Sequence, residues 1–178
     1  MGSEMCIRDR INDVPTSTPI TLAAIAEDSG ARLITQTELL GNANDIEGDA
    51  LTATGLTINT GNGALTDNGD GTWNYTPASD DDTDVSFTYT ITDGADNVAG
   101  TATLDITPIN DVPTTTPVTL TAIAEDSGVR LITQAELLGN ASDIEGDALT
   151  ATGLTINTGN GVVTDNGNGI WNLSLIHI

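Results

Sequence analysis

Acidic side chains cluster in short segments of this chain, and their spacing suits coordination of a hard cation. The segments are AEDSG (26–30), DIEGD (45–49), SDDDTD (79–84) and DGADN (93–97). Carboxylate and carbonyl oxygens are the ligands that Ca²⁺ takes, in sets of about six to eight. The competing interpretation is that Asp, Asn and Gly form solvated turns. That interpretation is favoured for one loop alone, and cation binding is favoured where several such loops gather.

The residue types that are missing or rare limit which metals and partners this chain can bind. Residues 11–172 contain no Cys, His, Met or Lys, and their only basic residues are Arg32 and Arg130. Zinc and copper sites built on His or Cys are therefore excluded. The net charge of −22 excludes nucleic acid as an expected partner and disfavours anionic membrane surfaces, because both are bound through Lys and Arg. No apolar run approaches the length of a membrane span, so we expect no direct membrane insertion.

The two ends of the chain differ from the rest. MGSEMCIRDR (1–10) and LSLIHI (173–178) resemble translated sequencing-adapter DNA, and they hold every Cys, Met and His of the chain. We interpret both segments as adapter-derived scars, to be set aside before the fold is considered. We expect them to pack against nothing.

The remaining chain is a tandem repeat. Residues 109–172 align without a gap on residues 11–74, at an offset of 98 (109 − 11 = 98), and ten of the 64 positions differ. The correspondence ends where Leu173 faces Tyr75. This predicts a complete repeat over 11–108 and a second repeat over 109–172 that is truncated before its last two strands. We expect the second repeat not to form a complete sandwich.

Periodicity within one repeat predicts strands. We expect strands at 19–26, 30–35, 49–59, 63–67, 72–76, 85–91 and 98–108, with a bulge at Gly55 and a tight turn at 68–71. Thr35 and Glu38 have the spacing of a capping box, which predicts one short helical turn ending at Gly41. The aromatic residues Trp73, Tyr75, Phe87 and Tyr89 are expected in the core. The predicted fold class is all-β, with immunoglobulin-like sandwich repeats in tandem.

This topology would gather the acidic segments at the two ends of each sandwich. Asp13, Asp45, Glu47, Asp49, Asp93 and Asp96 would share the N-terminal end; Glu27, Asp28, Asp80, Asp81, Asp82 and Asp84 would share the other, where Glu27, Asp28 and one or more of the last four would bind the cation. At the junction the linker adds Asn110 and Asp111, and the second repeat adds Asp143, Glu145 and Asp147. Uncompensated carboxylates repel one another, so a cation is expected between them, and Ca²⁺ is the economical choice.

The repeat sequence resembles a known family. LITQAELLGNASDIEGDALTATGLT, NGDGTWNYTP, FTYTITDG and VAGTATLDITPINDVP together are similar to bacterial cadherin-like and VCBS-type tandem repeats of giant surface adhesins. The resemblance covers all of 11–172 and implies Greek-key, calcium-dependent repeats at the cell surface or outside the cell. DIEGD is similar to the acidic BC-loop ligands of cadherins, and PINDVP is similar to their interdomain linker. Val112 stands where the animal cadherin linker carries another Asn.

Three functions are compatible with this sequence. The favoured one is a calcium-stiffened, non-catalytic extender or adhesion repeat whose partners are neighbouring repeats and, at the surface, polysaccharide or protein. The alternative is a calcium-dependent polysaccharide-binding module, against which the aromatic residues count, because they suit the core. An enzyme is not expected: without His, Cys or Lys only carboxylate-pair chemistry such as glycoside hydrolysis remains, and near-identical acids in successive repeats indicate architecture.

Overall fold

The computed structural model describes residues 11–124 and 127–175, and the chain divides into two compact units that meet between Ile109 and Asn110. The first unit contains eleven strands and one helical turn. In chain order they are β1 (Thr16–Ser17), β2 (Ile20–Thr21), β3 (Ile25–Ala26), β4 (Arg32–Thr35), α1 (Gln36–Leu39), β5 (Ala43–Asn44), β6 (Thr52–Thr60), β7 (Ala64–Asp67), β8 (Thr72–Thr76), β9 (Val85–Thr92), β10 (Asn97–Leu104) and β11 (Ile106–Thr107).

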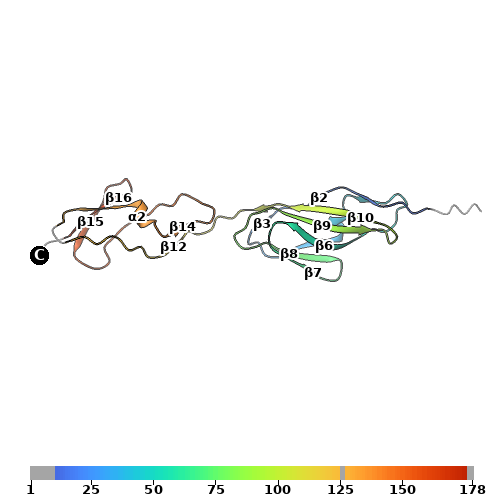
Figure 1. Cartoon of the computed structure of the whole chain (residues 1–178), viewed down its shortest axis with the longest axis horizontal. Helices are drawn as coiled ribbons and strands as arrows, with labels where there is room; N and C mark the ends of the chain where they lie inside the picture. The colour runs from blue at the N-terminus through green and yellow to red at the C-terminus, as the bar shows by residue number, and fades with distance from the viewer. Residues whose placement is uncertain (1–10, 125–126, 176–178) are drawn as a thin grey trace, which may run out of the picture. The chain divides into compact units, whose positions relative to one another are not determined.

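Two larger sheets form the sandwich of the first unit (Figure 1), and the strand pairs β1-β5 and β11-β3 add to them. One sheet has the order β2-β10-β9-β6, and the other has the order β4-β8-β7. Their facing side chains make a single hydrophobic core in which the Tyr75 and Phe87 rings meet edge to face, with centroids 5.4 Å apart. The predicted all-β sandwich is therefore correct, and so is the core position of Trp73, Tyr75, Phe87 and Tyr89, all of which are buried.

The helical turn α1 forms where the capping residues predict it. The Thr35 side chain accepts a hydrogen bond from the Glu38 N–H, and the Glu38 carboxylate accepts one from the Thr35 N–H. Arg32 Nη2 also donates to Glu38 Oε1 at 2.8 Å. Together these contacts join β4 to the helical turn that follows it.

The long β6 strand is bulged as predicted. Its register against β9 shifts between Thr54 and Thr57, around Gly55, whose φ is +64°.

The predicted single strand over 19–26 is wrong in detail, because the segment forms two short strands. β2 pairs in parallel with β10, and β3 pairs in parallel with β11. The chain therefore makes two separate pairings with a break between them.

The second unit contains β12 (Thr114–Thr115), β13 (Arg130–Thr133), α2 (Gln134–Leu137), β14 (Ala141–Ser142), β15 (Gly161–Asp165) and β16 (Ile170–Leu175). Its three-stranded sheet, β13-β16-β15, repeats the β4-β8-β7 sheet. Residues 150–158 have the same sequence as β6 but form no strand. In the first unit β6 is paired to β9, and no copy of β9 follows in this chain.

The expectation that residues 173–178 pack against nothing is wrong for 173–175. These residues continue β16, where Leu173 pairs with Arg130 and Leu175 pairs with Gly161. Leu173 takes the place that Tyr75 has in β8, and an apolar residue there can extend the ladder whatever its origin. Residues 1–10 and 176–178 lie outside the described part of the chain. In the part that is described, no helix is long and apolar enough to cross a membrane.

Candidate metal-binding groups

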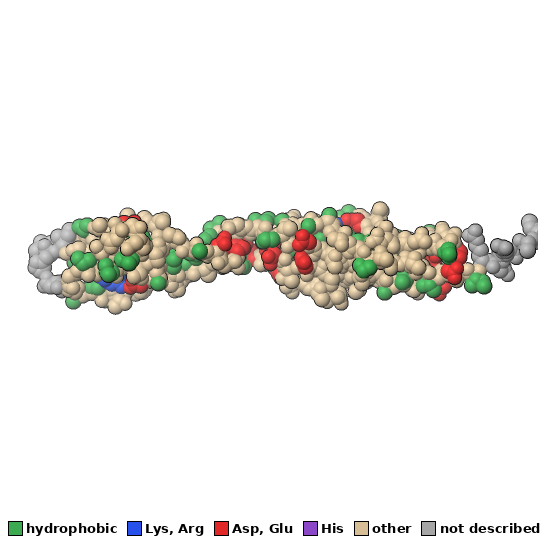
Figure 2. All heavy atoms as spheres, turned by 90° about the horizontal axis from the view of Figure 1, so that it is seen from above, with side chains coloured by type: hydrophobic (Ala, Val, Ile, Leu, Met, Phe, Trp, Pro, Cys, Tyr) green, Lys and Arg blue, Asp and Glu red, His purple; other side chains and the backbone are tan. Residues whose placement is uncertain are grey.

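Acidic side chains gather at each end of the first unit (Figure 2). At the N-terminal end the 45–49 loop is organised by Asp45, which is 9% exposed. Its Oδ1 accepts hydrogen bonds from the N–H groups of Glu47, at 2.9 Å, and Asp49, at 3.1 Å. Its Oδ2 is buried and accepts no hydrogen bond from the described residues. A buried carboxylate oxygen without a donor is costly, and a bound cation would compensate it.

Asn12 and Asp13 join this loop to the 93–97 turn. The Asp13 N–H donates to Glu47 Oε2 at 3.2 Å. Asn12 Nδ2 donates to Asp93 Oδ2 at 3.0 Å and to Asp96 Oδ2 at 2.9 Å. The hydrogen bond from Asn12, together with those from the Asp96 and Ala95 N–H groups, lowers the pKa of Asp93. We name Asp13, Asp45, Glu47, Asp49, Asp93 and Asp96 the N-end group.

At the opposite end, Glu27 fixes where the linker begins. Its side chain is buried at 2% exposure, and its Oε1 accepts a hydrogen bond of 2.7 Å from the Ile109 N–H. The Glu27 N–H donates to the Thr107 carbonyl at 3.0 Å, next to the β3–β11 pairing. Glu27 is therefore a carboxylate in the interior that holds the backbone at the end of the first unit.

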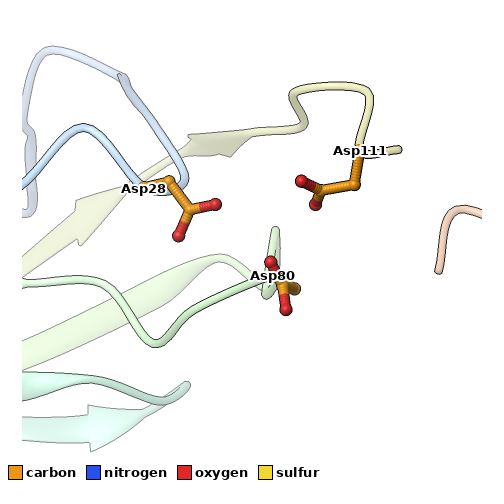
Figure 3. A group of neighbouring side chains, drawn as sticks. All are labelled: Asp28, Asp80 and Asp111. Atoms are coloured by element: carbon orange, nitrogen blue, oxygen red, sulfur yellow. The ribbon is translucent and has the colours of Figure 1, made fainter. Parts of the chain in front are cut away.

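Asp28 and Asp80 lie beside each other at this end, with one carboxylate oxygen of each within 4.8 Å of the other (Figure 3). Both are exposed. Both have positive φ, 56° and 53°, and among the described residues they are the only residues other than glycine that do. Asp adopts this left-handed conformation more readily than most residues, and such positions concentrate at functional sites. We name Glu27, Asp28 and Asp80 the C-end group.

Figure 3 also labels Asp111, which belongs to the second unit. Asp111 belongs to the linker and follows Ile109 by two residues. The hydrogen bond from Ile109 to Glu27 fixes the backbone at the last residue of the first unit.

Sequence reasoning left Asp80, Asp81, Asp82 and Asp84 as alternatives, and the structure separates three of them. Asp80 approaches Asp28. Asp81 accepts hydrogen bonds from Asn62 Nδ2 and the Thr83 N–H. Asp84 accepts one of 3.4 Å from the Ile106 N–H. Asn12 was not predicted at all, although its copy Asn110 was named as a candidate ligand.

The second unit repeats the N-terminal arrangement. The Asp111 N–H donates to Glu145 Oε2 at 3.2 Å, as Asp13 does to Glu47. The Asp147 N–H donates to Asp143 Oδ1 at 3.0 Å, and Asn110 Nδ2 donates to the Asp111 carbonyl at 2.8 Å. The hydrogen bond from Asp111 to Glu145 thus joins the linker to the 143–147 loop.

Neither arginine of residues 11–172 neutralises these carboxylates. Arg32 is paired with Glu38 at 2.8 Å, and Arg130 is paired with Glu136 at 2.9 Å. Each glutamate caps its own helical turn. The end groups therefore carry negative charge with no basic side chain of 11–172 left to balance it.

Comparison with known proteins agrees with this architecture. The family model of the cadherin-like domain matches residues 11–107 and again residues 109–174. The chain belongs to the cadherin-like domain family. Membership indicates an extracellular, adhesion-type repeat, and domains of this family typically bind calcium. No curated protein sequence matches the chain significantly.

Three solved structures also resemble this cadherin-like chain. Two are endo-fucoidan hydrolases of glycoside hydrolase family 107. MfFcnA4 is 23% identical, with a TM-score of 0.40, and the alignment covers 93% of this chain and 24% of the enzyme. MfFcnA9 is 20% identical, with a TM-score of 0.33 and coverages of 92% and 29%. The third, a chimeric titin Z1Z2, is 10% identical, with a TM-score of 0.27 and coverages of 93% and 83%. This chain spans about a quarter of the length of the hydrolases.

Proposed function

We propose that this chain is a calcium-stiffened extender or adhesion repeat of a larger extracellular protein, and that it is not catalytic. Calcium binds the end groups of each repeat. The ligands we assign at the C-end group are Asp28 and Asp80. The buried Glu27 holds the linker backbone in place. The N-end group makes the corresponding site towards a preceding repeat.

The main support for this proposal is the uncompensated negative charge of the C-end group. Asp28 and Asp80 bring two carboxylates within 4.8 Å in a segment with no basic side chain available. At pH 7 like charges at that separation repel one another, and Ca²⁺ turns the repulsion into attraction. Family membership supports the choice of calcium, because cadherin-like domains typically bind it. The buried, unpartnered Oδ2 of Asp45 supports the same chemistry at the N-end group.

The aromatic side chains argue against a sugar-stacking module. The chain has five aromatic residues, all described, and none is more than 4% exposed: Trp73, Tyr75, Phe87, Tyr89 and Trp171. A polysaccharide-binding surface of the stacking kind needs an exposed ring. The structural role is therefore favoured over the polysaccharide-binding role.

Thermal unfolding in calcium and in chelator tests the proposal. A Trp171→Phe variant leaves Trp73 as the only tryptophan, so its fluorescence reports on the first unit alone. Extracellular sites of this kind bind calcium at about 10⁻⁴ to 10⁻³ M. At about 10 mM calcium, binding to the folded state alone then adds about 1.4 to 2.7 kcal/mol. In a domain of this size that raises Tm by roughly 5 to 20 °C.

The control variants are matched in charge. Asp28→Asn and Asp80→Asn remove one carboxylate each, and Asn tolerates the same left-handed backbone, so both variants should fold and lose most of the calcium response. Asp67→Asn removes a carboxylate from the β7–β8 turn instead and should keep the full response. Equal stabilisation by magnesium or sodium chloride, or an unchanged response in Asp28→Asn, would show that the acids form only a solvated surface.

A further inference from the structure

The turn between β6 and β7 lies directly against the β8–β9 loop, the segment 77–84. Gly61 and Gly63 form the two sides of this turn, and their φ angles are +92° and +120°. A Cβ atom on Gly61 would lie 2.7 Å from the Asp84 carbonyl oxygen. A Cβ atom on Gly63 would lie 2.6 Å from the carbonyl oxygen of Thr76, the last residue of β8. Only glycine allows the turn to approach both ends of the loop this closely.

Asn62 lies between the two glycines and joins the turn to the loop. Its Nδ2 donates a hydrogen bond to Asp81 Oδ2, and its backbone carbonyl accepts one from the Tyr75 hydroxyl. Asp81 Oδ1 accepts a hydrogen bond of 2.9 Å from the Thr83 N–H. Both carboxylate oxygens of Asp81 are thus engaged by the protein. The Asp81 side chain is half-buried, whereas that of Asp80 is exposed.

The contact between Asn62 and Asp81 fixes the loop next to Asp80. Among the described residues, no other hydrogen bond joins residues 79–83 to the rest of the first unit. Asp80 has a left-handed backbone, with φ of +53°, and one of its carboxylate oxygens lies within 4.8 Å of one of Asp28. Such a backbone persists only where surrounding contacts hold it. The hydrogen bond to the following residue, Asp81, is a contact of that kind.

We propose that Asn62 is the positioning residue of the C-end group: its hydrogen bond to Asp81 holds the β8–β9 loop so that Asp80 stays beside Asp28. The calcium part of this inference rests on the proposed function. In this arrangement Asp81 anchors the loop and is not itself a calcium ligand, and the Asn62 amide is the donor that it requires.

The sign of a charge effect distinguishes this role from a purely electrostatic one. A carboxylate added near a cation site attracts the cation through space and strengthens its binding. A carboxylate in place of the Asn62 amide would also repel Asp81, so that the loop and Asp80 with it would move away from Asp28. A positioning role therefore predicts that added negative charge at this position weakens calcium binding.

Three variants of nearly unchanged side-chain size test the role. Asn62→Asp replaces the donor by a second carboxylate. Adding Asp81→Asn to it reverses the hydrogen bond, because the new amide can donate to the new carboxylate, and it restores the net charge of the parent chain. Asn59→Asp is the control. It adds the same charge to an exposed residue of β6 and keeps its partner, because the Ser86 hydroxyl can donate to the new carboxylate.

Backbone ¹⁵N order parameters of residues 80–83, measured in chelator, report on the loop without calcium. They should be about 0.85 in the parent chain and in Asn59→Asp, and below about 0.6 in Asn62→Asp. The double variant should have the values of the parent. Loop order that is unchanged in Asn62→Asp, or that is also lost in the double variant, would overturn the proposal.

Calcium affinity is the second readout, taken from the calcium dependence of Tm in chains that also carry Trp171→Phe. Asn62→Asp should bind calcium about threefold to tenfold more weakly than the parent. The double variant should bind as the parent does, and Asn59→Asp should bind at least as tightly. Tighter binding by Asn62→Asp would show a purely electrostatic effect, and weak binding by the double variant would show that Asp81 is a ligand; either result contradicts the proposal. If calcium leaves the parent unchanged while the order parameters behave as expected, the proposed function fails and the role of Asn62 in holding the loop stands.

Discussion

The surroundings of Glu38 predict how the stability of the first unit depends on pH. Burial raises the pKa of its carboxyl, but hydrogen bonds from the Thr35 N–H and hydroxyl and the nearby Arg32 lower it by more, so the pKa lies below its usual value. A depressed folded-state pKa means that ionised Glu38 stabilises the first unit. That stability is present above the unfolded value, about 4.5, and is lost as pH falls through the lower folded value.

A Glu38→Gln variant separates the charge from the cap. Gln can still complete a capping box, so the helical turn should persist while the pH-dependent part of its stability disappears. The difference in Tm between the parent chain and Glu38→Gln should therefore shrink as pH falls from about 6 to about 3. Thermal melts followed at Trp73 measure it. Thr35→Ala, in contrast, should cost about 1 kcal/mol at pH 7, where the cap itself is lost. A Tm difference that stays constant over this pH range would contradict the assignment.

At the scale of elements, identical sequences take different structures in the two units. TATGLTINT forms the nine-residue strand β6 at 52–60 and no strand at 150–158. Local preference is the same in both copies, so the partner decides: β6 lies against β9, which has no copy after 150–158. Strand formation here depends on cross-strand pairing more than on residue type.

Hydrogen exchange on one sample tests this comparison, because each copy is the control for the other. Amides of 52–60 should exchange at least about a hundredfold more slowly than those of 150–158 when the first unit is folded. β4 and β13, which are paired in both units, should both be protected. Equal protection of 52–60 and 150–158 would mean that 150–158 finds another partner in solution.

The same comparison explains how much the sequence could predict. Short-range features were predictable: the Thr35–Glu38 cap and the alternation of Val85, Phe87, Tyr89 and Ile91 depend on neighbours along the chain. The division of 19–26 into β2 and β3 was not, because it depends on pairing with β10 and β11, about eighty residues away. The continuation of β16 through Leu173 was not predictable from the repeat pattern, because it depends on pairing with Arg130 and Val163.

For the candidate ligands, too, the sequence predicted which segments gather but not which residue within a segment takes part. Topology placed the DIEGD loop and the linker at one end, and the hydrogen bonds from Asp13 to Glu47 and from Asp111 to Glu145 agree with that placement. Choosing among Asp80, Asp81, Asp82 and Asp84 required the left-handed backbone of Asp80, which no sequence pattern specifies. Asn12 could have been found from its copy Asn110. Whether these residues bind calcium stays a prediction.

At the scale of the whole molecule, the two units differ in how much core each one has. Fifteen buried hydrophobic residues form the core of the first unit, whereas in the described part of the second only Ile132 and Trp171 are buried to that degree. A fully buried aliphatic or aromatic side chain contributes about 1.5 to 3 kcal/mol, and a domain's net stability is only about 5 to 15 kcal/mol. Losing the β9–β10 part of the core removes an amount comparable to that whole margin.

The chain should therefore unfold in two separate transitions. Each unit holds one tryptophan, Trp73 or Trp171, so Trp171→Phe and Trp73→Phe variants report on the first and second unit in turn. In chelator, Trp73 should show a cooperative transition, while Trp171 should change at a lower temperature, over a broader range or with no cooperative step. Phe keeps an aromatic ring in each core, and near-ultraviolet circular dichroism of the parent chain checks that neither variant moves the transitions. Coincident, equally sharp transitions for both tryptophans would show that the incomplete second repeat is as stable as the first.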